Sequence, residues 1–207
     1  MNTAIKSLTA ALLLAGSTNV FAASSVDLTV KGLITPSACT PALSNGGSVD
    51  YGKISAKDLN IDRTTPLDTQ TLQLTVTCDA ATLMALDADD NRAGSNYGND
   101  DMEFGLGLIN STEKLGAMTV QLRSPLADGV ATRTIGSDDG GVTWYSERYL
   151  THDNLISVAD ASVDAPIPVQ VLTSDLVVNP KIAPTSGLTL TNEAAIDGSV
   201  TVTVRYL

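Results

Sequence analysis

The stretch "GSVTVTVRYL", residues 198–207, decides the fold class. Its apolar residues stand at every second position, and polar residues separate them. This period of two is typical of a β-strand that has one face in a core and the other in water. The pattern recurs along the chain in six groups of residues: Val26, Leu28 and Val30; Leu72, Leu74 and Val76; Met118, Val120 and Leu122; Ile167, Val169 and Val171; Leu188 and Leu190; Val200, Val202, Val204 and Tyr206.

Turn sequences separate these predicted strands, and helical periodicity is almost absent. Glycine clusters with asparagine or aspartate in "SNGG" at 44–47 and "DDGG" at 138–141, which favours tight turns. Short strands at this spacing predict an all-β sandwich in a single domain. For residues 80–86 a helical turn, a strand and a loop all remain open. The polar residues 87–100 are predicted to form a long loop.

The first 22 residues are predicted to be a signal peptide. One lysine, Lys6, precedes an apolar run around Ala10–Ala15, and the sequence Val20-Phe21-Ala22 fits a cleavage site. We therefore expect cleavage after Ala22 and export of the remaining chain. The apolar run is too short to remain in a bilayer, so no membrane insertion is expected.

The net charge limits the classes of partner, and the two cysteines predict a disulfide. The chain has 207 residues, a formal net charge of −11, one histidine and two cysteines. The negative charge argues against nucleic acid and anionic membranes as partners, and it favours solubility. Cys39 and Cys78 are predicted to form a disulfide, because exported chains meet an oxidising environment. Two thiols and one histidine at these positions do not make a zinc site.

Two distant segments carry motifs that belong together. In "VKGLITPSACTPAL" (30–43) the pair Lys31-Gly32 precedes an apolar strand that runs into Cys39, and Cys78 closes the later strand "LQLTVTC". At the other end, alternating valines lead to the penultimate residue Tyr206. This combination resembles the subunits of chaperone–usher fimbriae. The segment "APIPVQVL" (165–172) is similar to their central, proline-flanked strand.

The resemblance implies an immunoglobulin-like β-sandwich that lacks its final strand and is completed by donor-strand exchange. The implied organisation is a signal peptide at 1–22, a donor-strand extension at 23–31 and a pilin-like domain at 32–207. In strand addition, main-chain hydrogen bonds give affinity and alternate side chains fill pockets. The implied donor residues are Val26, Leu28 and Val30, and the implied chaperone-binding strand contains Val200, Val202, Val204 and Tyr206.

The function implied by the resemblance is assembly without catalysis or a cofactor. The expected partners are a periplasmic fimbrial chaperone, an outer-membrane usher and neighbouring fimbrial subunits. The expected location is the fimbrium at the cell surface, reached through the periplasm, with a contribution to cell adhesion. The alternative is a secreted adhesin domain that binds a carbohydrate or receptor through aromatic loops. The aromatic residues considered for it are Tyr97, Trp144, Tyr145 and Tyr149.

The stretch "GSDDGGVTW" (136–144) resembles the Asp-box hairpin of sialidase-type β-propellers. Its matching residues are Ser137, Asp139, Gly141, Thr143 and Trp144. A propeller needs several four-stranded blades, and this chain has one such motif and too few residues. Sialidase chemistry also needs clustered arginines, and the six arginines here are scattered along the sequence: Arg63, Arg92, Arg123, Arg133, Arg148 and Arg205. The motif therefore predicts a structural hairpin and not an enzyme.

Two further motifs are incomplete. Asp87, Asp89 and Asn91 match positions 1, 3 and 5 of an EF-hand loop, but Arg92 and Gly98 occupy positions that require glycine and glutamate. We therefore predict a solvated acidic loop and no metal site, with a weak, irregular Ca²⁺ site between 87 and 99 left open. The single histidine, His152, is not accompanied by a Gly-x-Ser-x-Gly pattern.

Overall fold

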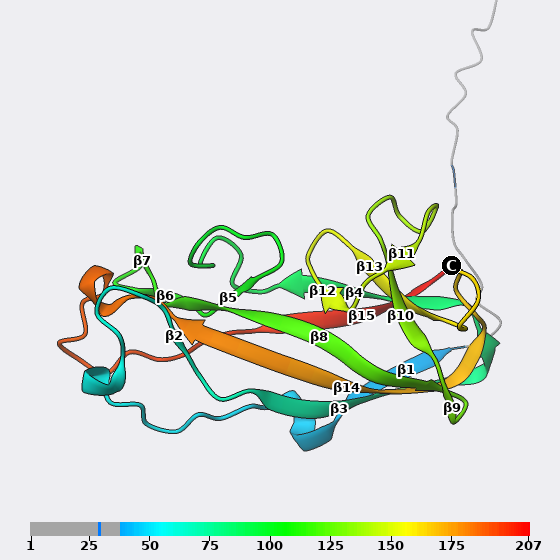
Figure 1. Cartoon of the computed structure of the whole chain (residues 1–207), viewed down its shortest axis with the longest axis horizontal. Helices are drawn as coiled ribbons and strands as arrows, with labels where there is room; N and C mark the ends of the chain where they lie inside the picture. The colour runs from blue at the N-terminus through cyan, green and yellow to red at the C-terminus, as the bar shows by residue number, and fades with distance from the viewer. Residues whose placement is uncertain (1–28, 30–37) are drawn as a thin grey trace, which may run out of the picture. The chain divides into compact units, whose positions relative to one another are not determined.

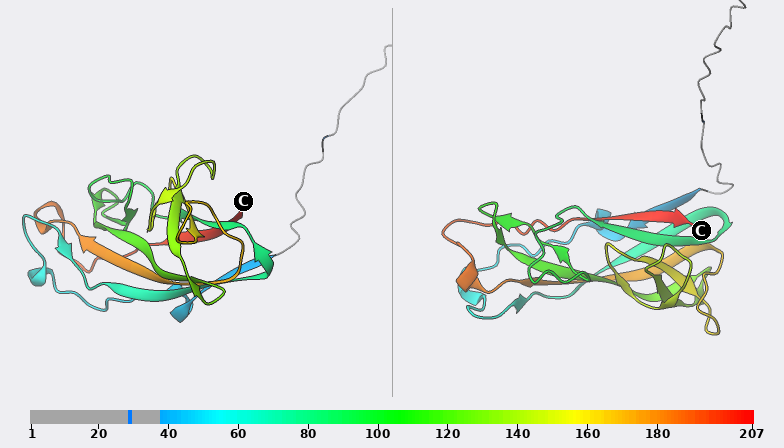
Figure 2. Two further views of the ribbon diagram at one scale, coloured as in Figure 1. Left: turned by 45° about the vertical axis from the view of Figure 1, so that its right-hand side comes forward. Right: turned by 90° about the horizontal axis from the view of Figure 1, so that it is seen from above.

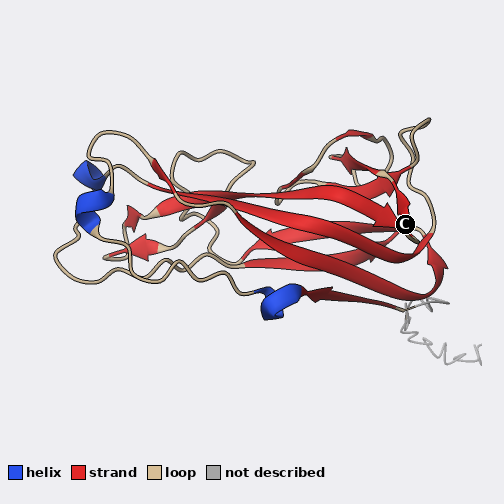
Figure 3. Cartoon of the chain, turned by 60° about the horizontal axis from the view of Figure 1, so that its bottom comes forward, coloured by secondary structure: helices blue, strands red, loops and turns tan. Residues whose placement is uncertain are grey.

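The chain forms two antiparallel β-sheets that face each other across one core. The computed structural model describes residue 29 and residues 38–207. The larger sheet has the central order β1-β3-β14-β8-β12, and the second has the order β11-β10-β13-β4-β15 (Figure 1). Figures 2 and 3 show the same layers from other sides, with the long strands joined by loops. The prediction of an all-β, sandwich-like fold is confirmed.

The strands of the larger sheet are β1 (Cys39–Leu43), β2 (Thr65–Pro66), β3 (Gln70–Thr82), β5 (Phe104–Gly105), β8 (Gly116–Ala127), β9 (Val130–Ala131), β12 (Tyr149–Leu150) and β14 (Val169–Ile182). The second sheet contains β4 (Met84–Asp90), β10 (Arg133–Ser137), β11 (Tyr145–Ser146), β13 (Leu155–Ala159) and β15 (Val200–Tyr206). A separate small hairpin pairs β6 (Leu108–Ile109) with β7 (Glu113–Lys114). The helical elements within the described residues are three single 3₁₀ turns, η1 (Ser44–Gly47), η2 (Ala56–Asp58) and η3 (Thr185–Gly187).

The alternating residues build the core as the sequence predicts. In β3, Leu72, Leu74 and Val76 are 5%, 1% and 0% exposed, and the residues between them face outward. They pack with side chains of the second sheet, such as Leu86 and Ile156. Burying such side chains contributes about 1.5–3 kcal/mol each, so this shared core holds the two sheets together.

Three local predictions are wrong. Residues 87–90 lie in β4, because β15 pairs with them over the full length of the strand. Val171 is exposed, because the pairing of β14 with β3 shifts by a bulge after Val169 and turns the alternation over. Leu188 and Leu190 lie outside any strand, in a segment held by Glu113, which accepts hydrogen bonds from the Thr189 backbone N–H and hydroxyl.

Other predictions fall outside the part that the structure describes. The predicted signal peptide lies among residues 1–28, and so do the donor residues Val26 and Leu28. Val30 lies in the second undescribed range, residues 30–37. Within the described residues no helix is long and apolar enough to cross a membrane.

Candidate functional site: an edge strand beside an open groove

Strand β15 is the last strand of its sheet, and its apolar row is only partly covered. In the described part of the chain it pairs with β4 alone, from Val200 opposite Asp90 to Tyr206 opposite Met84. Val200, Val202 and Val204 pack against the core but remain half-buried. Equivalent residues of the central strands are almost fully buried. The main chain of β15 therefore borders an incompletely covered side of the core.

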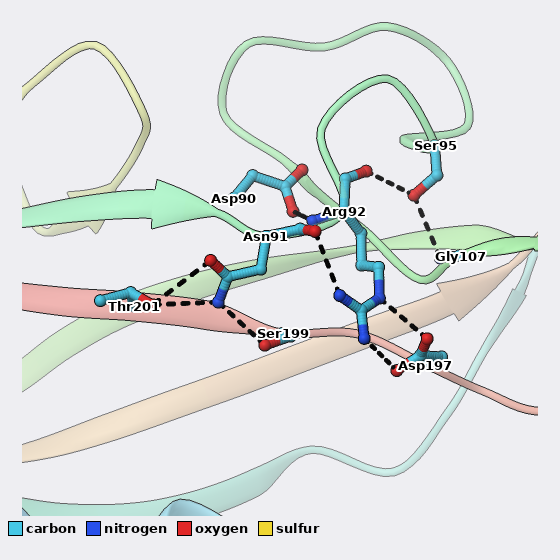
Figure 4. A network of polar contacts seen from close by, with 8 residues as sticks. All are labelled: Asp90, Asn91, Arg92, Ser95, Gly107, Asp197, Ser199 and Thr201. Atoms are coloured by element: carbon cyan, nitrogen blue, oxygen red, sulfur yellow. Dashed lines mark hydrogen bonds and ion pairs between the residues drawn. The ribbon is translucent and has the colours of Figure 1, made fainter.

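A polar network holds the beginning of β15 in place (Figure 4). The Asn91 side-chain amide donates hydrogen bonds to the Ser199 hydroxyl at 2.9 Å and to the Thr201 hydroxyl at 3.0 Å. Arg92 donates two hydrogen bonds, from Nε and Nη2, to the two carboxylate oxygens of Asp197 at 2.8 and 2.7 Å. These bonds keep the pKa of Asp197 below its ordinary value. The network fixes where the strand starts.

The other end of β15 is joined to the disulfide strand. The backbone N–H of Cys39 donates a hydrogen bond to the Tyr206 hydroxyl at 2.9 Å. Cys39 itself is bonded to Cys78, its direct partner in the pairing of β1 with β3. The predicted disulfide is confirmed, and it indicates an extracytoplasmic location. The penultimate tyrosine thus ties the last strand of one sheet to the first strand of the other.

A groove of about 490 Å³ lies beyond the beginning of β15. Its lining includes residues 49–54, residues 192–196 and the buried apolar side chains of Leu115 and Ile182. Lys53 and Glu193 form an ion pair of 2.7 Å between these two segments, and both side chains are 89% exposed. Such a pair is worth little in water, so it does not seal the groove.

The Asp-box residues form a compact hairpin loop between β10 and β11. The Asp139 carboxylate accepts the backbone N–H groups of Val142 and Thr143 at 3.0 and 2.9 Å and the Thr143 hydroxyl at 2.6 Å. The Ser137 hydroxyl donates to Asp139 and accepts from the backbone N–H of Gly141, whose φ of +95° favours glycine. Trp144 donates its indole N–H to the Gly141 carbonyl at 3.0 Å. Each of these side chains is engaged within the loop itself.

Replacing Asp139 with asparagine is expected to loosen this hairpin. The hydroxyl and backbone N–H of Thr143 lower the pKa of Asp139 far below its ordinary value, and Ser137 adds to the effect. The pKa of Asp139 is lower in the folded state than in the unfolded state. The stabilisation that its carboxylate gives the hairpin is therefore present above the unfolded-state pKa of about 3.9, and it is lost as pH falls through the folded-state pKa. Hydrogen–deuterium exchange at Val142 and Thr143 should therefore show protection that persists between pH 7 and pH 4.

In D139N this protection should fall by about tenfold or more, because a charge-assisted bond becomes a neutral one. The matched control is Asp138→Asn, which removes the neighbouring carboxylate that accepts the Tyr145 hydroxyl at 2.6 Å. Equal protection in D139N and wild type would show that the carboxylate does not hold the loop.

The aromatic residues considered for ligand binding do not line one pocket. Tyr97 lies beside Lys114 at a pocket of about 450 Å³, whereas Tyr149 lines a different pocket. Tyr145 is bonded to Asp138, and partial burial together with this carboxylate raises its pKa to about 12. Trp144 is half-buried in its own hairpin. Tyr97 and Tyr149 therefore do not line a common pocket.

The two incomplete motifs do not converge on a site. Asp87 and Asp89 lie on β4, where Asp87 forms an ion pair with Arg205 at 3.0 Å. The described residues contain no group of three or more His, Cys, Asp or Glu side chains placed to hold a metal ion. His152 is exposed, and its Nε2 lies 3.2 Å from the carboxylate of its neighbour Asp153.

Comparison with known proteins gives a family match over part of the chain. Residues 28–121 match the family model described as "Protein of unknown function (DUF1120)". Over these residues the chain matches the DUF1120 family. The match spans the region from the end of the predicted donor segment through Cys39, Cys78 and β4 into β8, and it stops before the hairpin and β15.

Two proteins of Escherichia coli K12 are similar to this chain. It is 27% identical to Protein GltF over 96% of this chain and 97% of that protein. It is 40% identical to the uncharacterized protein YhcF over 41% of this chain and 37% of that protein. The similarity to GltF extends over nearly the whole of both chains.

Proposed function

We propose that this protein is a structural subunit or minor component of a chaperone–usher fimbria. In this proposal the sandwich is immunoglobulin-like and lacks one strand beside β15. The N-terminal extension of a neighbouring subunit supplies that strand, and the proposed outcome is a fibre that contributes to cell adhesion. The observation that carries the proposal is the half-buried row Val200, Val202 and Val204 on a strand that ends its sheet.

The main-chain groups along β15 that are unpaired within the described residues support the proposal of strand addition. An edge strand with free N–H and C=O groups beside exposed apolar surface tends to pair with another chain and to aggregate if left bare. An alternating segment such as "ASSVDLTVK" (23–31) has the pattern needed to fill that place. Before assembly, a periplasmic chaperone would cover the same edge, and an outer-membrane usher would receive the subunit. The groove of about 490 Å³ would extend the acceptor surface past the beginning of β15.

The test compares the exported chain alone, with a fimbrial chaperone, and with "ASSVDLTVK" appended after Leu207 through a short turn. The chain alone should be scarce or polymeric, and the chaperone should recover it as a one-to-one complex. The appended strand should yield a monomer whose thermal unfolding no longer depends on the chaperone. A chain that is abundant, monomeric and unchanged by the appended strand would show that the sandwich is complete, and it would overturn the proposal.

The matched control appends the same segment with serine in place of Val26, Leu28 and Val30. This variant keeps the length and most of the main-chain hydrogen bonds but loses the three apolar side chains. It should therefore leave the chain dependent on the chaperone. Equal stabilisation by both appended segments would show that the apolar row of β15 does not select its partner.

A further inference from the structure

The fold gathers three arginines that are scattered in the sequence. Arg123 from β8, Arg133 from β10 and Arg148 beside β12 line one pocket of about 780 Å³. They are half of the six arginines in a chain whose net charge is −11. Such a concentration of cations in an acidic protein is not needed for solubility. Guanidinium groups recognise carboxylates in a bidentate manner, so this grouping has the chemistry needed to hold an anion.

Two of these arginines, Arg123 and Arg148, form no ion pair within the described residues, although Asp175 lies opposite Arg123 on β14. Arg123 donates from Nε and Nη2 to one oxygen of Gln121, at 3.1 and 2.8 Å, and the Gln121 side chain is neutral and buried. Arg148 takes part in none of the ion pairs that the described residues form. Arg133 is paired with Asp164 and also donates to the Asp160 carbonyl at 2.7 Å. The free positive charge of the pocket therefore comes from Arg123 and Arg148.

One carboxylate, that of Glu147, also lines the pocket, and it accepts hydrogen bonds from the backbone. Glu147 accepts the N–H groups of Arg148 and Tyr149 at 2.6 and 2.9 Å through one oxygen. Gly136 allows this arrangement, because a Cβ at that position would lie only 2.7 Å from the Cβ of Glu147. With Arg133 paired outside the pocket, the two free arginines outweigh this single acid.

The main chain around Arg123 is fixed in an unusual shape. The pairing of β8 with β14 shifts by a bulge at this point, and Ser124 has a φ of +50°. The hydroxyl of the buried Ser174 donates to the Arg123 carbonyl at 2.8 Å, and the backbone N–H of Leu122 donates to the Arg148 carbonyl at 2.9 Å. The two free arginines are thus held by connected parts of the same sheet.

The remaining lining residues favour a sugar as the carrier of the anion. The pocket lining includes the aromatic residue Tyr149 and three residues with hydroxyl side chains: Ser124, Thr134 and Ser146. We propose that the pocket binds a carboxylated sugar, with Arg123 and Arg148 on the carboxylate and the hydroxyl groups on the ring.

This site is separate from the groove beside β15. The pocket lies where β8 and β12 of one sheet approach β10 of the other, whereas β15 pairs with β4 and approaches β1. Strand addition at β15 would leave the pocket open. The inference therefore does not rest on the proposed assembly function, and either can fail without the other.

The test is calorimetric titration of the purified chain, alone or in its chaperone complex, with N-acetylneuraminic acid and glucuronic acid. N-acetylglucosamine and inorganic phosphate serve as neutral and anionic comparisons. The acidic sugars should bind saturably, and their affinity should fall as salt is raised, because screening weakens exposed charges. Absence of binding, or equal binding of the neutral sugar, would overturn the proposal. Phosphate that binds as tightly as the acidic sugars would reduce the pocket to a general anion site and overturn the sugar assignment.

Arg123→Gln and Arg148→Gln should each weaken binding by about tenfold or more, because each removes one charge-assisted contact. The matched control is Arg63→Gln, which removes the same charge from an exposed loop outside the pocket and should leave the affinity within about twofold. The melting temperatures of the variants verify that each one folds. Wild-type affinity in both pocket variants would show that these arginines do not hold the ligand.

Discussion

Val202→Asp is expected to remove most of the folded chain from the periplasm. Val202 lies in the middle of β15, opposite Ala88, and packs against the shared core. An aspartate there would place a charge without a partner against apolar side chains, at a cost of about 3 kcal/mol. Stabilities of whole domains are only about 5–15 kcal/mol, so this loss is a large share of the total. The measurements are the yield of soluble exported chain in the presence of the fimbrial chaperone and the urea midpoint of the form that carries the appended strand.

Thr203→Asp is the matched control, one residue further along the same strand. Thr203 is exposed on the opposite face of β15 and pairs with Asp87 of β4. An exposed aspartate stays hydrated, so the loss of folding free energy should be small. Repulsion between the new carboxylate and Asp87 should account for it and amount to about 1 kcal/mol at most. If T203D lost as much folded chain as V202D, the outward alternation of β15 would be refuted.

The strands that form the core were predictable from local sequence. In β3 and β15 the period of two follows directly from a strand with one wet face, and the structure places Leu72, Leu74 and Val76 inside. No partner needs to be known to see this pattern. It fails where a bulge intervenes, as at Val171, because a single extra residue exchanges the two faces.

The polar half of β4 was not predictable in the same way. Asp87, Asp89 and Asp90 have low strand propensity, and their local composition is that of a loop. They are extended because β15, more than one hundred residues later in the chain, pairs with them in register. Tertiary pairing here overrides local preference, and a single sequence carries no direct signal of it.

The two candidate sites differ in whether local sequence predicts them. The edge strand has a local signature, the alternating valines before Tyr206, and so the sequence alone indicated it. The arginine pocket has none, because Arg123, Arg133 and Arg148 come from three segments that meet only when the sheets pack. The three arginines are separated in the sequence, and the fold brings them to one pocket. A signal for the pocket exists only in the topology.

Removing the disulfide is expected to lower the melting temperature by roughly 8–16 °C, on the basis of chain entropy. The bond closes a segment whose ends are separated by 39 positions, which corresponds to about 4 kcal/mol of stabilisation. For a domain of this size each kcal/mol shifts the melting temperature by roughly 2–4 °C. The variant is Cys39→Ser with Cys78→Ala, because Cys39 is half-exposed and Cys78 is buried.

The wild type under reducing conditions is the control that leaves the sequence unchanged. Thermal unfolding should place it close to the double variant, since both lose the same cross-link between β1 and β3. Both should also weaken the hold of β1 on the end of β15, because the Cys39 N–H donates to Tyr206 only while β1 stays in register. A double variant that melts within about 2 °C of the oxidised wild type would refute the cross-link as a main source of stability.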